Sequence, residues 1–267
     1  MKTFKLLSII FISTCLFTCY TSCKKESSPE PTPATTSTPA PTPTPTPTPS
    51  ATSSNPTPTP SDANGVLVAL KTISTVNVPF VGNIKQEIGV PVAFFFNTPG
   101  TYLDAGTVSC NSSNLSKQSN NAYTFTPGTS EPTGVSYSSG VNWSVGGNSV
   151  NVVPNFTYSP SIGFPELDSI AGNISTVTRS SGVTIAATNL ITNADSVIFS
   201  VYGPSGTAQK VLANTSTHTF SASDLSALGT GNGYIQIAAY KIADQTFSAK
   251  KYYFVNEAVF TKMVTIE

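Results

Sequence analysis

Apolar and polar residues alternate in short runs from Gly65 to the C-terminus, and clusters of Gly, Asn, Ser and Pro separate these runs. Alternation with a period of two is typical of β-strands that bury one face. No long stretch repeats apolar residues at the spacing of a helix, so we predict an all-β region. The strands expected in its first half are Val66–Thr75, Val90–Asn97, Gly106–Asn111, Ala122–Thr126, Gly134–Tyr137, Val141–Val145 and Val150–Phe156.

The alternation is clearest in the second half of this region. Ser223 is expected to cap a single helical turn that brings Leu225 and Leu228 to one side. A helical turn before a strong strand resembles the corner between the fifth and sixth strands of immunoglobulin-like sandwiches, although the Cys pair and the buried Trp of that family are missing from this half. Strands are expected at 183–187, 197–201, 209–212, Thr217–Phe220, Tyr234–Lys241, Phe247–Val255 and Val259–Ile266, with a turn at 203–206.

The region after residue 64 is too long for one simple sandwich, which takes about 100 residues. A cluster of Pro and Gly at 154–165 indicates a boundary. We therefore predict two tandem β-sandwich domains, residues 65–163 and 164–267, the second of them immunoglobulin-like. The pattern of 104–125 loosely parallels that of 195–220, so a distant duplication is an alternative.

The N-terminus has the three parts of a secretory signal: two lysines, the apolar run Leu6–Tyr20 and small residues before Cys23. A membrane-spanning helix needs about 20 predominantly apolar residues, so the run predicts a cleaved signal peptide, residues 1–22. Tyr20-Thr21-Ser22-Cys23 resembles the lipobox of bacterial lipoproteins, with Tyr20 and Ser22 where the family prefers Leu and Gly or Ala. The resemblance implies a diacylglyceryl group on the Cys23 sulfur. Lipidation of Cys19, or cleavage without a lipid, is the alternative.

The start of the mature chain, Cys23-Lys24-Lys25-Glu26, is similar to that of lipoproteins from Bacteroidota-type bacteria. The resemblance implies an outer-membrane lipoprotein, exposed at the cell surface, whose membrane partner is reached through the lipid on Cys23. No Asp follows Cys23 directly, which favours the outer membrane by the general bacterial sorting rule.

Residues 23–64 form the predicted stalk, which is nearly all Pro, Thr, Ser and Ala from Pro29 onward. Such a composition offers little apolar surface to bury, so we predict a disordered linker that proline keeps extended, at about 3.1 Å per residue. Its Thr and Ser hydroxyls are candidates for O-linked sugars. Two further tripeptides, centred on Ser169 and Ser196, resemble the Asp-Ser/Thr-aliphatic sites of O-glycosylation in Bacteroidota.

Charge and cysteine content exclude several classes of function. The precursor has 13 basic and 13 acidic residues, charged residues make up 10% of the chain, and Arg179 is its one arginine. Nucleic-acid binding needs clustered Lys and Arg, so it is not expected. Cys110 is the one cysteine of the β-region and cannot form an intramolecular disulfide there. We predict that it is a small buried side chain.

Residues that could carry chemistry are few. His218 stands alone on an expected strand, and metal sites or catalytic triads need further partners. Glu166 and Asp168 are the one close acidic pair, and we interpret them as solvated acids rather than as the paired carboxylates of a glycosidase. Trp143 shares the apolar face of its strand with its neighbours at i±2, so core packing is favoured over ligand stacking. The sequence thus predicts no catalytic, cofactor or metal site.

Together these features favour a non-catalytic, lipid-anchored surface protein that presents β-sandwich domains for binding or adhesion to an extracellular protein or glycan. The layout also resembles starch-binding lipoproteins of polysaccharide-uptake systems, which string immunoglobulin-like domains on a lipid anchor. That resemblance implies glycan capture as an alternative. A structural role in the envelope, for example through edge-strand pairing, is the other alternative.

Overall fold

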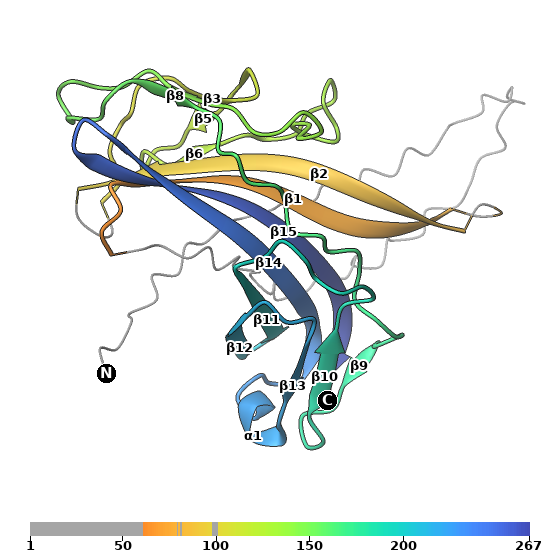
Figure 1. The fold of residues 1–267 in the computed structure, drawn as a ribbon. Helices are drawn as coiled ribbons and strands as arrows, with labels where there is room; N and C mark the ends of the chain where they lie inside the picture. Colours follow the sequence, from red (N-terminus) through yellow and green to blue (C-terminus); the bar gives the residue numbers. More distant parts are fainter. Residues whose placement is uncertain (1–60, 79, 81, 98–100) are drawn as a thin grey trace, which may run out of the picture.

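The structure is a computed structural model, and it describes residues 61–78, 80, 82–97 and 101–267. The predicted signal peptide, Cys23 and most of the linker lie outside these described residues, so those assignments stay predictions. The described part of the chain is nearly all β-strand with one short helix, which confirms the all-β prediction. Its sheets pack on one another (Figure 1).

The elements follow the chain in the order seen in Figure 1. The strands of the first half are β1 (Gly65–Val78), β2 (Gly82–Phe95), β3 (Val108–Cys110), β4 (Ser113–Asn114), β5 (Ser116–Lys117), β6 (Tyr123–Thr124), β7 (Trp143–Val145) and β8 (Phe156–Tyr158). Those of the second half are β9 (Thr176–Val177), β10 (Val183–Ala186), β11 (Ser196–Gly203), β12 (Gly206–Ala213), β13 (Thr217–Phe220), β14 (Gly231–Phe247) and β15 (Lys250–Ile266), with helix α1 (Ala222–Leu225) before β14.

One nine-stranded sheet organises the molecule, with the order β12-β11-β14-β15-β1-β2-β6-β5 and β9 beside the end of β15. The central pairing joins the first long strand to the last. β1 and β15 run parallel, in a register that extends from Gly65 opposite Tyr252 to Ile73 opposite Phe260. The sheet is therefore continuous across the expected boundary between residues 163 and 164.

This continuity corrects the prediction of two tandem domains, each with its own sheets. β1 carries apolar residues on both faces, so it suits the middle of a sheet with a neighbour on each edge. Those neighbours are β2 from the first half and β15 from the second. The Pro-rich segment that suggested a boundary links the halves of this shared sheet instead.

Two smaller layers cover one face of the large sheet. Even-numbered residues of β15 point to this face, so Phe254 and Phe260 lie in neighbouring cores. The sheet β4-β3-β7-β8 packs over β1, β2 and the start of β15 (Figure 1). The pair β10-β13 and α1 pack over β11, β14 and the end of β15. The largest buried side chains of the two cores include Trp143, Tyr252, Phe95, Phe199, Ile185 and Leu225.

The opposite face of the large sheet carries a third cluster of buried side chains. Phe94 belongs to this cluster and Phe95 to the first face, as expected for successive residues of a strand. Phe96 is also buried, so the three consecutive phenylalanines serve two cores. The strand members of the third cluster are Val66, Val68, Val92, Phe94, Ile198, Ala238, Tyr240, Val255 and Val259.

Two expected strands of the first half do not form. At 150–156 the chain turns: Val152 has a φ of +56°, and Val150 and Val152 are 88% and 62% exposed. The alternating residues at 150–155 do not join a sheet, and β8 begins only at Phe156. At 134–137 a single bridge between Gly89 and Gly134 replaces the expected strand.

The second half also differs in detail from the expectation. The capping residue of α1 is Ser221, which forms a capping box with Asp224, so the cap lies two residues before the predicted Ser223. Leu225 and Leu228 are both buried as predicted. β14 and β15 meet at Ser248 and Ala249, whose φ values of 48° and 60° match a tight two-residue hairpin.

Candidate functional site

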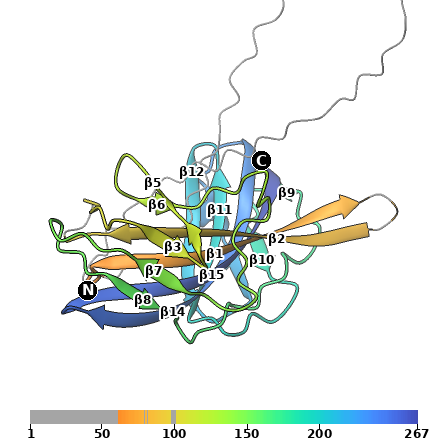
Figure 2. The same cartoon turned by 90° about the horizontal axis from the view of Figure 1, so that it is seen from above.

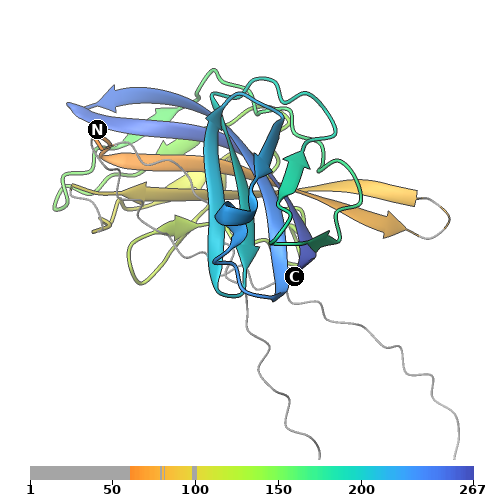
Figure 3. The same cartoon turned by 90° about the horizontal axis from the view of Figure 1, so that it is seen from below.

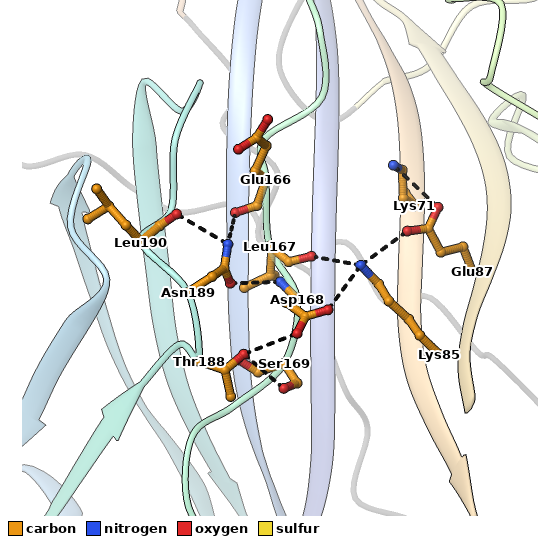
Figure 4. Close-up of polar contacts among 10 residues, drawn as sticks. All are labelled: Lys71, Lys85, Glu87, Glu166, Leu167, Asp168, Ser169, Thr188, Asn189 and Leu190. Carbon is orange, nitrogen blue, oxygen red and sulfur yellow. Dashed lines mark hydrogen bonds and ion pairs between the residues drawn. The ribbon is translucent and has the colours of Figure 1, made fainter. Parts of the chain in front are cut away.

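The predicted acidic pair lies on the segment that links the two halves across the covered face of the sheet. Leu167 and Ile170 point into the core, and Glu166 and Asp168 point outward. Asn189 holds both acidic residues by their backbone. Its Oδ1 accepts from the Asp168 N–H at 3.0 Å, and its Nδ2 donates to the Glu166 carbonyl at 2.8 Å (Figure 4).

Each carboxylate of this pair has its own partner. Thr192 Oγ1 donates to Glu166 Oε2 at 2.7 Å, and Lys85 Nζ lies 3.3 Å from Asp168 Oδ1. The same Lys85 reaches Glu87, which also pairs with Lys71 (Figure 4). These contacts fasten the linking segment to the β1–β2 hairpin. Neither acid lines the hollow beside His218 or the hollow beside Gly134.

Trp143 is fully buried at the centre of its layer, as the alternation predicted. Cys110 pairs with it across β3 and β7, is a free thiol and is fully buried. Burial raises the pKa of the Cys110 thiol to about 12, so it is protonated at neutral pH. The prediction of a buried, apolar role for this cysteine is confirmed.

His218 lies in β13 beside a hollow of about 230 Å³ lined by Lys210, Asp224 and other residues. Its ring packs edge-on against Phe220, with centroids 4.6 Å apart. Partial burial, with a smaller effect from the Lys210 charge, holds the pKa of His218 below its usual value, and Asp224 opposes the shift. The described residues bring together no group of three or more His, Cys, Asp or Glu that could hold a metal ion.

A second hollow, of about 390 Å³, lies beside the loop that carries Gly134. Its lining is polar and holds one charged residue, Glu131. Asn111, on its wall, has a φ of +46° and uses its amide to bridge the carbonyls of Ser136 and Gly140. The hydroxyl residues that line the hollow are Ser113, Ser130, Thr133, Ser136 and Ser139.

Sequence reasoning missed a polar cluster around Asp104. Its Oδ1 accepts from Tyr123 Oη at 2.8 Å and from the Gly106 N–H at 2.9 Å, and its Oδ2 lies 2.6 Å from Lys117 Nζ. These hydrogen bonds, with Lys117 as the largest cause, lower the pKa of Asp104 to about 2. The cluster ties β5 and β6 to the loop before β3, and nothing in the local sequence marks it.

Replacing Asp104 by Asn is expected to lower the free energy of unfolding at pH 7 by about 1–3 kcal/mol, because hydrogen bonds to a charged group are lost. The pKa of Asp104 is lower in the folded state, so its contribution is complete above pH 4 and disappears as the pH falls toward 2. Urea unfolding at pH 7 and below pH 3 should thus show a difference in unfolding free energy from the parent that becomes smaller at acidic pH.

The control is Asp244→Asn, which removes an exposed ion pair and should lower the free energy of unfolding by less than about 0.5 kcal/mol. A loss that does not depend on pH would contradict this role.

The β1–β2 hairpin is the other feature that the sequence did not predict. The two strands pair from Gly65 opposite Phe95 to Val78 opposite Gly82, whereas β15 follows β1 only as far as Ile73. The far half, residues 74–78 of β1 and 82–88 of β2, is therefore a two-stranded ribbon, and we call it the arm. Figures 2 and 3 show the arm projecting beyond the rest of the molecule.

Two apolar side chains near the end of the arm are open to solvent. Residues 74–84 contain no charged side chain. Phe80 is fully exposed, and Ile84 is 44% exposed. Phe80 is the one aromatic residue among the large hydrophobic side chains that are exposed in the described part of the chain. In the sequence, Pro79 and Gly82 between two β-type runs are a signal from which this hairpin could have been predicted.

The predicted glycosylation serines differ in setting. Ser169 is partly exposed on the linking segment, and its Oγ lies 3.0 Å from Thr188 Oγ1. Ser196 begins β11 inside the large sheet, opposite Tyr240 and Ala213. Both serines are partly exposed, and both sites stay predictions.

In the part of the chain that the structure describes, no helix has the length and apolar character needed to cross a membrane. Comparison of the sequence with protein-family models and with curated proteins finds no match to either.

Proposed function

We propose that the protein is a non-catalytic lipoprotein of the outer membrane, anchored through Cys23 and exposed at the cell surface, that binds or adheres through protein contacts. The observation that carries the proposal is the position of the arm. The described chain begins beside the start of β1, where Asp62 accepts a hydrogen bond from Tyr253 Oη at 2.8 Å. The exposed Phe80 lies past the other end of β1, on the order of 45 Å away at about 3.3 Å per residue. A described chain that begins at one end of β1 and carries an exposed apolar side chain past the other end suits outward presentation.

Glycan capture is the second candidate. The polar hollow beside Gly134 supports it, since hydroxyl and carboxylate groups hydrogen-bond to sugars. Sugar-binding surfaces commonly add exposed aromatic rings, and here Trp143 and the three phenylalanines at 94–96 are buried. Contact with protein through the arm is therefore the better-supported proposal.

Photo-crosslinking on intact cells tests the proposal. A photoreactive phenylalanine analogue in place of Phe80 should give discrete crosslinked protein species, because this side chain is fully exposed at the tip. The matched control places the same analogue at Val150, which is 88% exposed but lies in the turn before β8, and it should give none of these species. Absence of products at position 80, together with retention of the protein on polysaccharide gels, would favour glycan capture instead.

A further inference from the structure

The arm has an outer edge with which no described residue pairs. β2 pairs with β1 along its whole length. On its other side it meets β6 only at Val92 and Ala93, and Gly134 only at Gly89. The outward N–H and C=O groups of residues 84–88 therefore face no strand of the described chain. An open edge of this kind is a template for pairing with another chain.

The hydrogen bonds of Gly89 show which residues of β2 direct their backbone N–H and C=O groups toward the open edge. Gly89 donates its N–H to the Thr133 carbonyl and accepts from the Val135 N–H, both at 2.9 Å. In an antiparallel sheet the direction of these groups alternates along a strand, so the backbone N–H and C=O groups of Glu87 and Lys85 point to the same side as those of Gly89. An incoming antiparallel strand must place residues whose backbone groups point toward β2 opposite these two.

The sequence of this edge is self-complementary. Residues 84–88 read Ile-Lys-Gln-Glu-Ile. If a second copy runs antiparallel with Gln86 opposite Gln86, each Lys85 faces Glu87 of the other copy and each Ile84 faces Ile88. The outward residues of both copies then meet in hydrogen-bonded pairs. A centre shifted by one residue to Lys85 places two lysines opposite each other, which is unfavourable.

We propose that the arm is a self-association surface on which two copies of the chain pair antiparallel through residues 84–88, about a two-fold axis at Gln86. Both charged side chains are part-exposed, Lys85 to 40% and Glu87 to 45%, so each can contact the other copy in exchange for its exposed ion pair with Asp168 or Lys71. The contact uses the same patch on both copies, as a two-fold interface requires. It rests on the proposed adhesive function and deepens it by naming a second copy of this chain as the partner.

The structure also limits the length of this pairing. Gly134 occupies the position beside Gly89, so the ladder stops at Ile88. The end of each arm therefore has to turn away from the other copy's loop, and the strong twist of a two-stranded ribbon allows such a turn. A ladder of five residues buries far less than a standard interface and predicts a weak pair. Anchoring on one membrane supplies the high local concentration that such a pair needs.

Disulfide trapping tests the register. Gln86 faces itself in a pair without mutual hydrogen bonds, where Cα atoms lie about 4.5 Å apart, within the range that a disulfide spans. The full-length lipoprotein carrying Gln86→Cys, reconstituted in vesicles and mildly oxidised, should give a covalent dimer on a non-reducing gel. The control Thr75→Cys is exposed on the same arm but far from its symmetry mate, and it should stay monomeric. Cys110 is buried and does not interfere.

Charge variants in the Gln86→Cys background test the chemistry of the edge. Lys85→Glu or Glu87→Lys alone places like charges opposite each other and should reduce the dimer severalfold. The double variant with both changes restores opposite charges and should recover it. The two single variants mixed should crosslink to each other. Equal trapping at positions 75 and 86, or trapping that ignores charge, would overturn the proposal.

The outcome separates this inference from the proposed function. Flotation of the parent protein with vesicles reports on the lipid anchor, and dimer formation in concentrated detergent solution reports on the edge without a membrane. An anchored protein that never crosslinks at position 86 contradicts self-association alone. A crosslinked protein that does not float contradicts the anchor alone.

Discussion

Replacing Trp143 by Ala is expected to lower the free energy of unfolding by about 3–5 kcal/mol, the usual loss when a large buried aromatic side chain is truncated. The indole is fully buried among β3, β7, β8 and the large sheet. Its removal leaves a cavity that the surrounding side chains fill only in part, because they are closely packed and their strands are held by backbone pairing. Urea unfolding at pH 7 measures the loss. Trp143 is the one tryptophan of the chain, so far-UV circular dichroism rather than fluorescence must follow both proteins.

The control for this substitution is Val150→Ala. Val150 is 88% exposed in the turn before β8, and its truncation should change the free energy of unfolding by no more than about 0.5 kcal/mol. A comparable small change for Trp143→Ala would mean that the small sheet is not packed on the large one, and it would contradict the burial of the indole between them.

Replacing Cys23 by Ala is expected to abolish palmitate labelling and to remove the lipid hold on the membrane. One acyl chain binds a bilayer only marginally, whereas two or three hold a protein firmly, at about 0.8 kcal/mol for each buried methylene. The measurement is labelling with a palmitate analogue in cells, followed by membrane fractionation.

Cys19→Ala is the matched variant because Cys19 falls within the predicted signal peptide. It should leave labelling and fractionation unchanged. Label that survives Cys23→Ala but not Cys19→Ala would move the anchor to Cys19. Label that is absent from the parent protein would support cleavage without a lipid and would contradict the proposed anchor.

Local alternation predicted those parts of the fold whose neighbours lie nearby. Val141, Trp143 and Val145 alternate with polar residues, and all three are buried. The hairpin of β11 and β12 closes at the predicted turn of Gly203 and Gly206. In both places the period of the pattern identifies the strand directly.

Local alternation failed where strand formation depends on a distant partner. Val150 and Val152 alternate like a strand, yet no edge is available beside them, and they lie in an exposed turn. The arm shows the converse. No strand is predicted at residues 82–89, yet β1 pairs with β2 along its whole length there. Pairing with another segment thus decided both cases.

The partners of the candidate site residues lie even farther apart in the sequence. Asp104 gathers Tyr123 and Lys117 around one carboxylate, and neither spacing is a recognisable motif. Glu166 and Asp168 were evident as a pair, but their separate partners Thr192 and Lys85 come from other parts of the chain. A side chain's partners are set by the three-dimensional arrangement of strands, which a short window of sequence does not contain.

The sequence by itself determined the class of fold, the burial of Trp143 and Cys110 and the expectation of a lipid on Cys23, because each follows from local composition or local periodicity. Tertiary structure alone decided that the two halves share one sheet, since the parallel pairing of β1 with β15 joins residues at opposite ends of the β-region. It also decided that 84–88 form an open edge. Whether a strand has a neighbour on each side is a property of the whole sheet, and it left this self-complementary segment exposed.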